Sequence, residues 1–534
     1  MNGDYDADVV VVGYGPTGVV AALTLAGEGA TTIAFEREQD VYQRARAMTV
    51  NDWTVRIFQA LGIDRRVAPT LEPQRASRWL TYDRTEIHRV EHPPSVMGGP
   101  SRFYNIYQPA LEKELRACAA ERPEIDVRFG YEVTDLEQDD EGVTIRAADL
   151  ASGRATTVRS RYVVAADGGS SRTRSVIGAS LLGDTLDVTW VVIDCRVKRW
   201  WPDRDILTFW SDQERPVVDV ALSAGNHRWE IPLRPDESPA DYPTSVEVWR
   251  LLHAIGVSED DVEIHQHAFY RHHTRTADTW RAGRVFLAGD AAHLMPPWAG
   301  AGMQSGVRDA YDLGWKMGRV LTGSLAPEWL DTYEAERRPN VAYYTDLAVH
   351  LGRIIKQELS PVEQAELMRR ADRDPAGELA TPRLAAGWFR GSFARTSLVG
   401  RMVPQPMVTD TLGRRLLLDD FLGNGFVLLG ADVDPLEVLS PAEREGWDRL
   451  GARYVRVSPT AAYASGPDAC VDTDRMLLPW LEGSSARVVA VRPDRFVAAT
   501  DLEGLTVPQF PVPAAREGQH GPEGTVSEGA ATPR

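Results

Sequence analysis

The alternation of hydrophobic and polar positions divides the chain into stretches with different predicted structures. Near the start, the Val-rich run Asp8–Val12 is almost wholly apolar, which predicts a strand buried on both faces, as in a parallel sheet. A glycine turn, a helix over roughly Gly18–Glu28 and a strand at Thr31–Phe35 follow. This order of strand, turn, helix and strand predicts a βαβ unit.

The middle of the chain mixes an irregular segment, a helix and many strands. Residues 71–104 are polar and rich in Pro and Gly, whereas helical spacing returns over Gln108–Glu121. From about 183 to 270, apolar and polar residues alternate with many aromatics, which predicts an antiparallel sheet. Further short strands are predicted at 127–129, 142–147 and 157–164.

The last part begins with helix and ends with a polar tail. Helical spacing runs from Gln304 through about Lys356, and a separate unit begins after about residue 400. From about Val512 the chain is mainly Gly, Glu, Ala and Pro, so we expect a disordered tail. The strands predicted in the separate unit are 416–418, 426–429, 454–457 and 487–491.

Length, charge and cysteine content restrict the class of protein. A chain of 534 residues is too long for one core and predicts two or three domains. No apolar stretch reaches the roughly 18 residues that span a bilayer, and no secretory signal is visible, so we expect a cytoplasmic protein without membrane contact. The net charge of −18 argues against nucleic-acid binding. The three cysteines form no Cys-x-x-Cys pair and are expected to be structural thiols.

The glycine turn has the spacing of a dinucleotide-binding motif. Gly13-x-Gly15-x-x-Gly18 follows a strand and opens a helix, which is the context that this motif requires. Its glycines allow a tight turn and a close approach of the backbone to a pyrophosphate, whose charge the helix N-terminus favours. Glu36, at the end of the second strand, is placed to accept hydrogen bonds from a ribose. The alternative is a glycine-rich turn without a ligand.

A second motif lies more than 270 residues later, where an apolar strand ends in Gly289-Asp290. A Pro-rich corner and two glycines, Gly300 and Gly302, then lead into a helix that begins near Met303. The acid is placed to bind a sugar-like chain, and the helix N-terminus favours negative charge. The alternative is a capped helix after a turn. A third strand-to-helix corner begins at Asp167-Gly168-Gly169, which by itself is a weak signal.

Together and in this order, the three motifs resemble those of the flavin-dependent aromatic hydroxylases, over roughly residues 6–400. The branch that looks most similar contains 3-(3-hydroxyphenyl)propionate hydroxylase, phenol hydroxylase and polyketide-tailoring monooxygenases. By this resemblance, the glycine motif and Glu36 hold the ADP half of FAD, and Asp290 binds the ribityl chain. The cofactor-binding residues that the resemblance implies are Gly13, Gly15, Pro16, Thr17, Gly18, Glu36, Arg37, Arg46, Gln108, Asp167, Arg174, Gly289, Asp290, Pro297, Gly300, Gly302, Met303 and Gln304.

The chain departs from the family pattern at two places. Gln304, which by resemblance faces the pyrimidine edge of the flavin, stands where many members have Asn. Arg44 precedes Arg46 by two residues, so either arginine could be the one that faces the flavin.

The resemblance also implies an α/β architecture with a glutathione-reductase-like Rossmann FAD-binding fold. That domain is expected at 1–182 and 271–400, and an inserted antiparallel β-sheet domain for the substrate at 183–270, with 71–105 contributing. Residues 401–511 resemble a thioredoxin-like domain and 512–534 are the expected tail. Because this domain lacks a Cys-x-x-Cys pair, we expect a structural or oligomeric role, which allows a homodimer.

The implied reaction uses FAD, NAD(P)H and O₂ to hydroxylate a small aromatic or polyketide substrate through a flavin hydroperoxide. The cofactor carries the chemistry, so no catalytic side chain is assigned. The Pro297 carbonyl would meet the substrate hydroxyl, and Trp298 is either a pocket wall or a core residue. Tyr104, with Tyr107, and His273, with His272, are further substrate candidates, although structural roles would leave the same pattern.

Other functions stay open to different degrees. A plain nicotinamide dehydrogenase is disfavoured, because it would use the glycine motif but would not need the Asp290 motif. A flavin halogenase is disfavoured because Trp229-Glu230-Ile231-Pro232 matches only half of that family's Trp-x-Trp-x-Ile-Pro signature, and no lysine precedes Lys113. Baeyer–Villiger oxygenation or epoxidation by the same flavin intermediate, and a non-catalytic flavin-binding protein, are the alternatives. NADH and NADPH are not distinguished.

Overall fold

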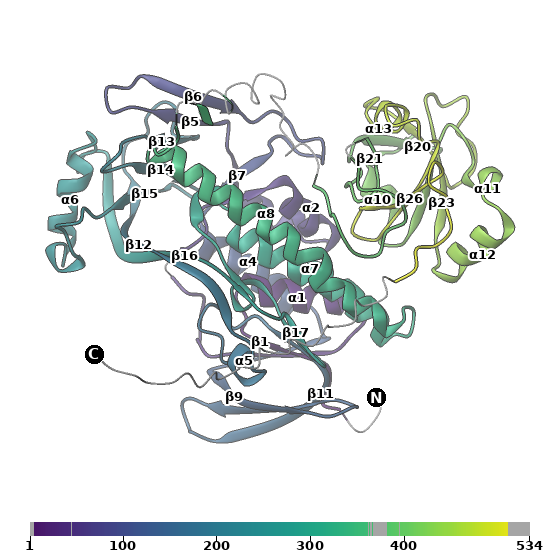
Figure 1. Ribbon diagram of the computed structural model, residues 1–534, viewed down its shortest axis with the longest axis horizontal. Helices are drawn as coiled ribbons and strands as arrows, with labels where there is room; N and C mark the ends of the chain where they lie inside the picture. Colours follow the sequence, from purple (N-terminus) through teal and green to yellow (C-terminus); the bar gives the residue numbers. More distant parts are fainter. Residues whose placement is uncertain are drawn as a thin grey trace, which may run out of the picture.

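The protein has a mixed α/β fold with several β-sheets (Figure 1). The computed structural model describes residues 5–43, 45–360, 362, 363, 366, 382–394 and 396–510. The predicted tail at 512–534 and Arg44 lie outside these residues. Within them, no helix is both long and apolar enough to cross a membrane. All three cysteines are buried and unpaired.

The first sheet contains the opening βαβ unit. Its central strands run parallel in the order β18-β11-β1-β2-β8, and Val9, Val10 and Val11 of β1 are fully buried, as the Val-rich run predicts. An antiparallel extension pairs β9 with β10 and β10 with β11. The strands of this sheet are β1 (Ala7–Val12), β2 (Thr32–Glu36), β8 (Ile125–Phe129), β9 (Tyr131–Gln138), β10 (Val143–Asp149), β11 (Ala155–Ala165), β17 (Arg281–Ala282) and β18 (Val285–Leu287).

The second sheet is antiparallel except where β13 runs parallel to β5. One face packs against helix α6 (Ser245–His253), which the sequence pattern did not predict. The other face, called here the inner face, carries Trp190, Val218 and Val220. Its strands are β5 (Ala76–Leu80), β6 (Glu86–Glu91), β12 (Leu181–Val197), β13 (Ile206–Trp210), β14 (Val217–Leu222), β15 (Asn226–Pro232), β16 (Val262–Ala277) and β19 (His293–Leu294).

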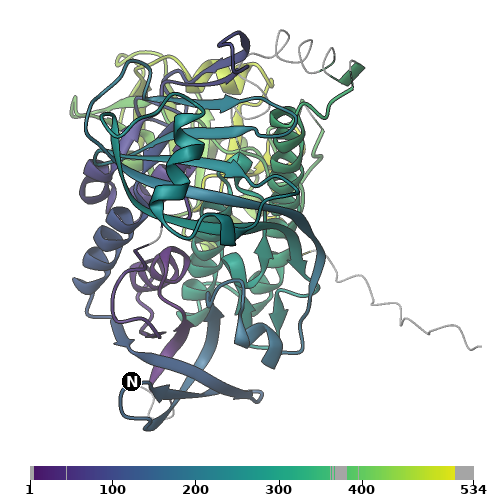
Figure 2. The same ribbon diagram turned by 90° about the vertical axis from the view of Figure 1, so that its left-hand side faces the viewer.

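Helices fill the space between these sheets (Figures 1 and 2). The helix predicted from Gln304 to about Lys356 is two helices, because the chain turns at Gly323 and Pro327 between Leu321 and Thr332. On α7, Gly314 and Gly318 let α1 approach so closely that an added Cβ would meet Thr24 and Glu28 at 2.7 and 2.4 Å. The longer helices are α1 (Pro16–Gly27), α2 (Asp52–Ala60), α4 (Gln108–Ala120), α7 (Gly302–Leu321) and α8 (Thr332–Ile355); α3 (Asp64–Val67) and α5 (Arg172–Val176) are short.

A third sheet forms the C-terminal unit, on the right in Figure 1. It docks on α2, where Arg56 donates two hydrogen bonds to Asp419 at 2.6 and 2.8 Å and Trp53 contacts Phe496. A separate small sheet consists of β3 (Thr49–Asn51), β4 (Leu71–Pro73) and β7 (Phe103–Ile106), in the order β3-β7-β4. The elements of the C-terminal unit are β20 (Met407–Asp410), β21 (Arg415–Leu417), α10 (Leu418–Leu422), β22 (Val427–Ala431), α11 (Pro435–Val438), α12 (Pro441–Arg449), β23 (Arg453–Ser458), β24 (Ala469–Asp472), α13 (Leu477–Glu482), β25 (Val488–Val491) and β26 (Val497–Thr500).

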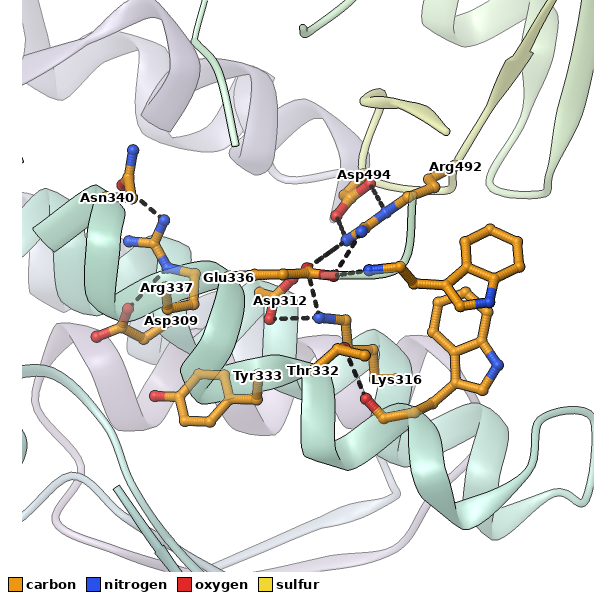
Figure 3. A network of polar contacts seen from close by, with 12 residues as sticks. Asp309, Asp312, Lys316, Thr332, Tyr333, Glu336, Arg337, Asn340, Arg492 and Asp494 are labelled. Carbon is orange, nitrogen blue, oxygen red and sulfur yellow. Dashed lines mark hydrogen bonds and ion pairs between the residues drawn. The ribbon is translucent and has the colours of Figure 1, made fainter. Parts of the chain in front are cut away.

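A buried ion network joins the C-terminal unit to α7 and α8 (Figure 3). Glu336 accepts two hydrogen bonds from Arg492, at 2.7 and 2.8 Å, and one from Lys316 at 2.7 Å. Lys316 also donates to Asp312 at 2.8 Å, and Arg492 donates to Asp494. Three carboxylates therefore share two cations. Burial raises the pKa of Asp312 to about 7, against the opposing effect of Lys316.

This excess of carboxylates predicts a pH-dependent stability. The raised pKa means that folded Asp312 keeps its proton up to about pH 7, whereas the unfolded chain releases it near pH 4. The contribution of Asp312 to the unfolding free energy therefore falls as pH rises through this window and is lowest above it. The Asp312→Asn variant lacks this titrating group. Its unfolding free energy, relative to that of the unmodified protein, should therefore rise by about 3 kcal/mol between pH 5 and pH 8. Urea unfolding at both pH values measures this gain, and parallel pH curves would contradict it.

Candidate active site

The glycine turn forms an open cradle at the start of α1. Gly13 has φ +87°, and a Cβ there would lie 2.5 Å from the carbonyl oxygen of Ala166. At Gly15, by contrast, an added Cβ would meet nothing within 4 Å. Helix α1 begins at Pro16 without a side-chain cap, so within the part of the chain that the structure describes its first N–H groups have no side-chain partner. This arrangement suits a phosphate group.

Glu36 lies at the end of β2, as predicted, and holds the turn. Its two carboxylate oxygens accept from the backbone N–H groups of Tyr14 and Glu38 at 2.7 and 2.9 Å. Each oxygen keeps lone pairs that can accept from a ribose hydroxyl. Arg37 is exposed beside it and forms an ion pair with Glu38.

The turn that carries Asp290 is held by a buried carboxylate on α7. Asp309 is fully buried and accepts hydrogen bonds from Gly289 N, His293 Nε2 and Arg337 Nε at 3.1, 2.7 and 2.9 Å. Burial alone would raise the pKa of Asp309, but His293 and Arg337 more than offset this effect and hold the pKa below its usual value. The side chain of Asp290 is left partly exposed.

Arg46 faces Asp290 across the site, at 3.8 Å between Nη1 and Oδ2. The loop of Arg46 is held from both sides. Gln108 Oε1 accepts from the N–H groups of Arg46 and Ala47, each at 2.8 Å, and Arg228 donates to the carbonyl oxygens of Ala45 and Arg46. Gln108 thus positions this loop. Arg228 was not predicted as a site residue, and the loop carbonyls that it binds lie more than 180 residues away in the sequence.

The Asp167 corner adjoins the Asp290 turn through Arg174. This buried arginine donates to the carbonyl oxygens of Ala291 and Gly169, at 2.9 and 2.8 Å. Asp167 Oδ2 accepts from Thr173 N at 3.0 Å, whereas its buried Oδ1 has no hydrogen-bond partner among the described residues. Arg174 therefore joins two motifs, and Asp167 keeps a free acceptor.

The start of α7 combines a fixed side chain with open backbone groups. Gln304 is buried, accepts from Asn51 N at 2.9 Å and donates to the carbonyl oxygen of Gly300 at 2.6 Å. Its side chain is thus engaged within the protein. Among the described residues no side chain caps α7, so the N–H groups of Gly302 and Met303 at its N-terminus are left for another partner.

Trp298 is 7% exposed and belongs to the cluster on the inner face. It contacts Trp190 and His272 edge to face, with centroid distances of 5.9 and 5.2 Å, and Lys356 lies 5.6 Å from its ring. Burial, followed by the charge of Lys356, lowers the pKa of His272 to about 4. The cluster consists of Met48, Trp79, Trp190, Phe209, Val218, Val220, Leu222, Trp298 and Ile355.

The other substrate candidates lie in different surroundings. His273 is hydrogen-bonded to Thr185 at 2.9 Å, whereas the neighbouring His272 contacts Trp298. Tyr107 packs against the inner-face cluster, whereas Tyr104 belongs to the large core around α1. The carbonyl oxygen of Pro297 accepts a hydrogen bond from Gly300 N at 2.7 Å. This bond occupies one of the two lone pairs of the oxygen.

These features fit a long bipartite cofactor such as FAD. The open cradle at Gly15, the unpartnered Oδ1 of Asp167 and the uncapped helices α1 and α7 supply the donors and acceptors that phosphates, hydroxyls and a flavin ring require.

Comparison with known proteins agrees with this geometry. The model of a family described as the FAD binding domain matches residues 6–348, and that of the HcaD C-terminal domain matches residues 400–507. The chain belongs to the FAD-dependent aromatic hydroxylases, as its motifs predicted, and is a flavoprotein monooxygenase that takes FAD as its cofactor and NAD(P)H as reductant.

Two relatives and two solved structures illustrate the similarity. The chain is 33% identical to the 3-(3-hydroxy-phenyl)propionate/3-hydroxycinnamic acid hydroxylase of Mycobacterium sp. (strain JLS), over 93% of this chain and 89% of the relative. The enzyme of the same name from Burkholderia cenocepacia (strain HI2424) is 35% identical, with 93% and 94% covered. The flavin-dependent monooxygenase PieE has a TM-score of 0.76 at 25% identity, covering 92% and 96%. Aklavinone-11 hydroxylase, at 24% identity, has the same fold with a TM-score of 0.75, covering 94% and 96%.

The role of Asp309 leads to a prediction about cofactor affinity. Asp309→Asn removes the charge that holds Gly289 and His293, so the Asp290 turn should loosen and FAD should bind about tenfold more weakly. Asp312→Asn is the matched control, because Asp312 is a buried carboxylate one turn further along α7 that contacts Lys316 instead. Fluorescence titration of flavin-free protein with FAD measures both. Equal affinities for Asp309→Asn and the control would contradict the prediction.

Proposed function

We propose that the protein hydroxylates an aromatic substrate bound between the inner face of the second sheet and the corner formed by Asp290 to Gln304. In this proposal the first sheet and its helices are a glutathione-reductase-like Rossmann FAD-binding domain, for which the parallel order β18-β11-β1-β2-β8 is support. The C-terminal unit is thioredoxin-like. The domain boundaries expected at 182 and 270 fall inside strands β12 and β16, so these strands continue from one domain into the next.

The proposed FAD site follows the three motifs. Gly13 to Gly18 and Glu36 would hold the ADP half, and Asp167 would accept from a hydroxyl. Asp290 would bind the ribityl chain, and the N-terminus of α7 would face the ring. Because Arg46 is exposed and only 3.8 Å from Asp290, we assign to it the position nearest the flavin.

The substrate placement is carried by one observation, which is a set of buried polar atoms without partners around the inner face. Burying such groups costs free energy unless a ligand or water completes their hydrogen bonds. The cluster around them is aromatic, as an aromatic substrate requires. Four of the buried atoms that lack a partner among the described residues lie on or next to the inner face: Trp79 Nε1, Trp298 Nε1, His272 Nδ1 and Glu230 Oε2.

The chemistry that bound FAD supplies is activation of O₂ for transfer of one oxygen atom to an electron-rich ring. The protein then has to orient the substrate, exclude water and accommodate charge. The uncapped N-terminus of α7 stabilises negative charge, and Trp298 covers the site with a large apolar ring. The Pro297 carbonyl keeps one lone pair for a substrate hydroxyl. A base whose pKa is about 4 accepts a phenol proton poorly, so His272 is assigned a hydrogen-bonding role.

The proposal predicts that the purified protein is yellow and that phenols stimulate its oxidation of NADH or NADPH. We expect at least a tenfold stimulation by 3-(3-hydroxyphenyl)propionate, 3-hydroxycinnamate or a polycyclic phenol such as aklavinone, because substrate binding completes the partly satisfied site. Mass spectrometry after turnover in ¹⁸O₂ should show one labelled hydroxyl on the ring. A lactone or epoxide would instead identify Baeyer–Villiger oxygenation or epoxidation, and tight phenol binding without oxidation would identify a binding protein.

A further inference from the structure

Glu230 is a carboxylate buried on the inner face of the second sheet. It lies on β15, is 3% exposed, and has Val192 and Val218 as its neighbours on the adjacent strands. Neighbours in register share a face of the sheet, so Glu230 lies on the same face as Val218 of the inner-face cluster. A carboxylate between two valines is an unfavourable arrangement for stability alone.

The nearest cation does not satisfy this carboxylate. Arg228, two residues earlier on β15, approaches Glu230 only to 3.7 Å, between Nη1 and Oε1. Its hydrogen bonds go to Asp194, at 2.7 and 2.9 Å, and to the backbone of Ala45 and Arg46. Glu230 Oε2 has no hydrogen-bond partner among the residues that the structure describes. Burial raises the pKa of Glu230 to about 7, with Arg228 opposing and Asp194 adding to the shift.

The same face of the sheet meets the candidate active site. Arg228 and Glu230 point to one side of β15, and on that side Arg228 binds the loop whose Arg46 faces Asp290. Met48, from the same loop, and Trp298 pack in the inner-face cluster beside Val218. The unpartnered oxygen therefore belongs to the layer between the sheet and the proposed FAD site.

We propose that Glu230 accepts a hydrogen bond from a hydroxyl group of the aromatic substrate and thereby selects phenols over rings without a hydroxyl. A phenol O–H donates one hydrogen bond, so in this inference Glu230, and not the Pro297 carbonyl, receives it. The ionised form of Glu230, which prevails above about pH 7, accepts hydrogen bonds and does not donate them, so at pH 8 its ligand must bring an O–H or N–H group. The aromatic surroundings fit a ring, and an anionic substituent would be repelled from this position. This inference rests on the proposed function and names the substrate group that the site recognises.

The test compares two ligands that differ in one hydroxyl. Binding of 3-(3-hydroxyphenyl)propionate and of 3-phenylpropionate to the FAD-loaded protein is measured from the change in flavin absorption. The unmodified protein should prefer the phenol at least tenfold, because an unpaired buried acceptor rejects the ligand without the hydroxyl. In Glu230→Leu the preference should fall below threefold. The melting temperature of Glu230→Leu should rise, because a buried carboxyl lacking a full partner is replaced by an apolar side chain.

Asp219→Leu is the control on the same sheet. Asp219 lies on the opposite face and has full partners, His227 at 2.7 Å and Trp210 Nε1 at 3.1 Å. This variant should melt at a lower temperature and keep the phenol preference. The inference fails if the unmodified protein binds both ligands equally, if Glu230→Leu keeps the preference, or if it is destabilised as Asp219→Leu is. Absence of phenol-stimulated turnover in the unmodified protein would instead count against the proposed function.

Discussion

A fully buried carboxylate, Asp309, fixes the turn on which the candidate flavin site depends. Its partners come from the turn itself, through Gly289 and His293, and from α8, through Arg337. A buried charge is tolerated only when its hydrogen bonds are complete, so these groups have little freedom to shift. The backbone on either side of Asp290 is therefore set by α7 and α8. The position of the partly exposed Asp290 side chain is therefore set by its backbone.

Buried arginines perform the same task at the other junctions. Arg174 joins the Asp167 corner to the Asp290 turn, Arg228 joins the second sheet to the loop of Arg46, and Arg492 joins the C-terminal unit to α8. In two of these cases the guanidinium donates to backbone carbonyl oxygens of a loop, because its planar set of donors can hold several acceptors at once. The Arg46 and Asp290 side chains of the site thus lie on loops whose backbones are bound by buried charges. Such preorganisation suits a large cofactor, since little order has to be gained on binding.

The sequence was most informative where local spacing determines structure. The glycine motif, Glu36 and the Asp290 corner were recognisable because strand, turn and helix follow each other within a few residues. Contacts such as those of Arg228 and Asp309 could not be predicted, because they join segments that are distant along the chain or lie on helix faces with several possible partners. The face of the sheet on which a given side chain lies could not be predicted from the sequence either. His272 and His273 differ by one residue, yet one contacts Trp298 and the other Thr185, because a shift of one residue reverses the side of the sheet.

Two buried glutamates differ in how completely the fold satisfies their hydrogen bonds. At the ion network, Lys316 and Arg492 supply hydrogen bonds to Glu336 from two elements, as expected of a structural contact. On the inner face, Glu230 and the indole N–H of Trp298 are equally buried but lack such partners. An apolar residue at either position would avoid the desolvation cost of about 1–3 kcal/mol per group. A buried carboxylate that lacks hydrogen-bond partners beside the proposed site is explained by a ligand that completes its hydrogen bonds.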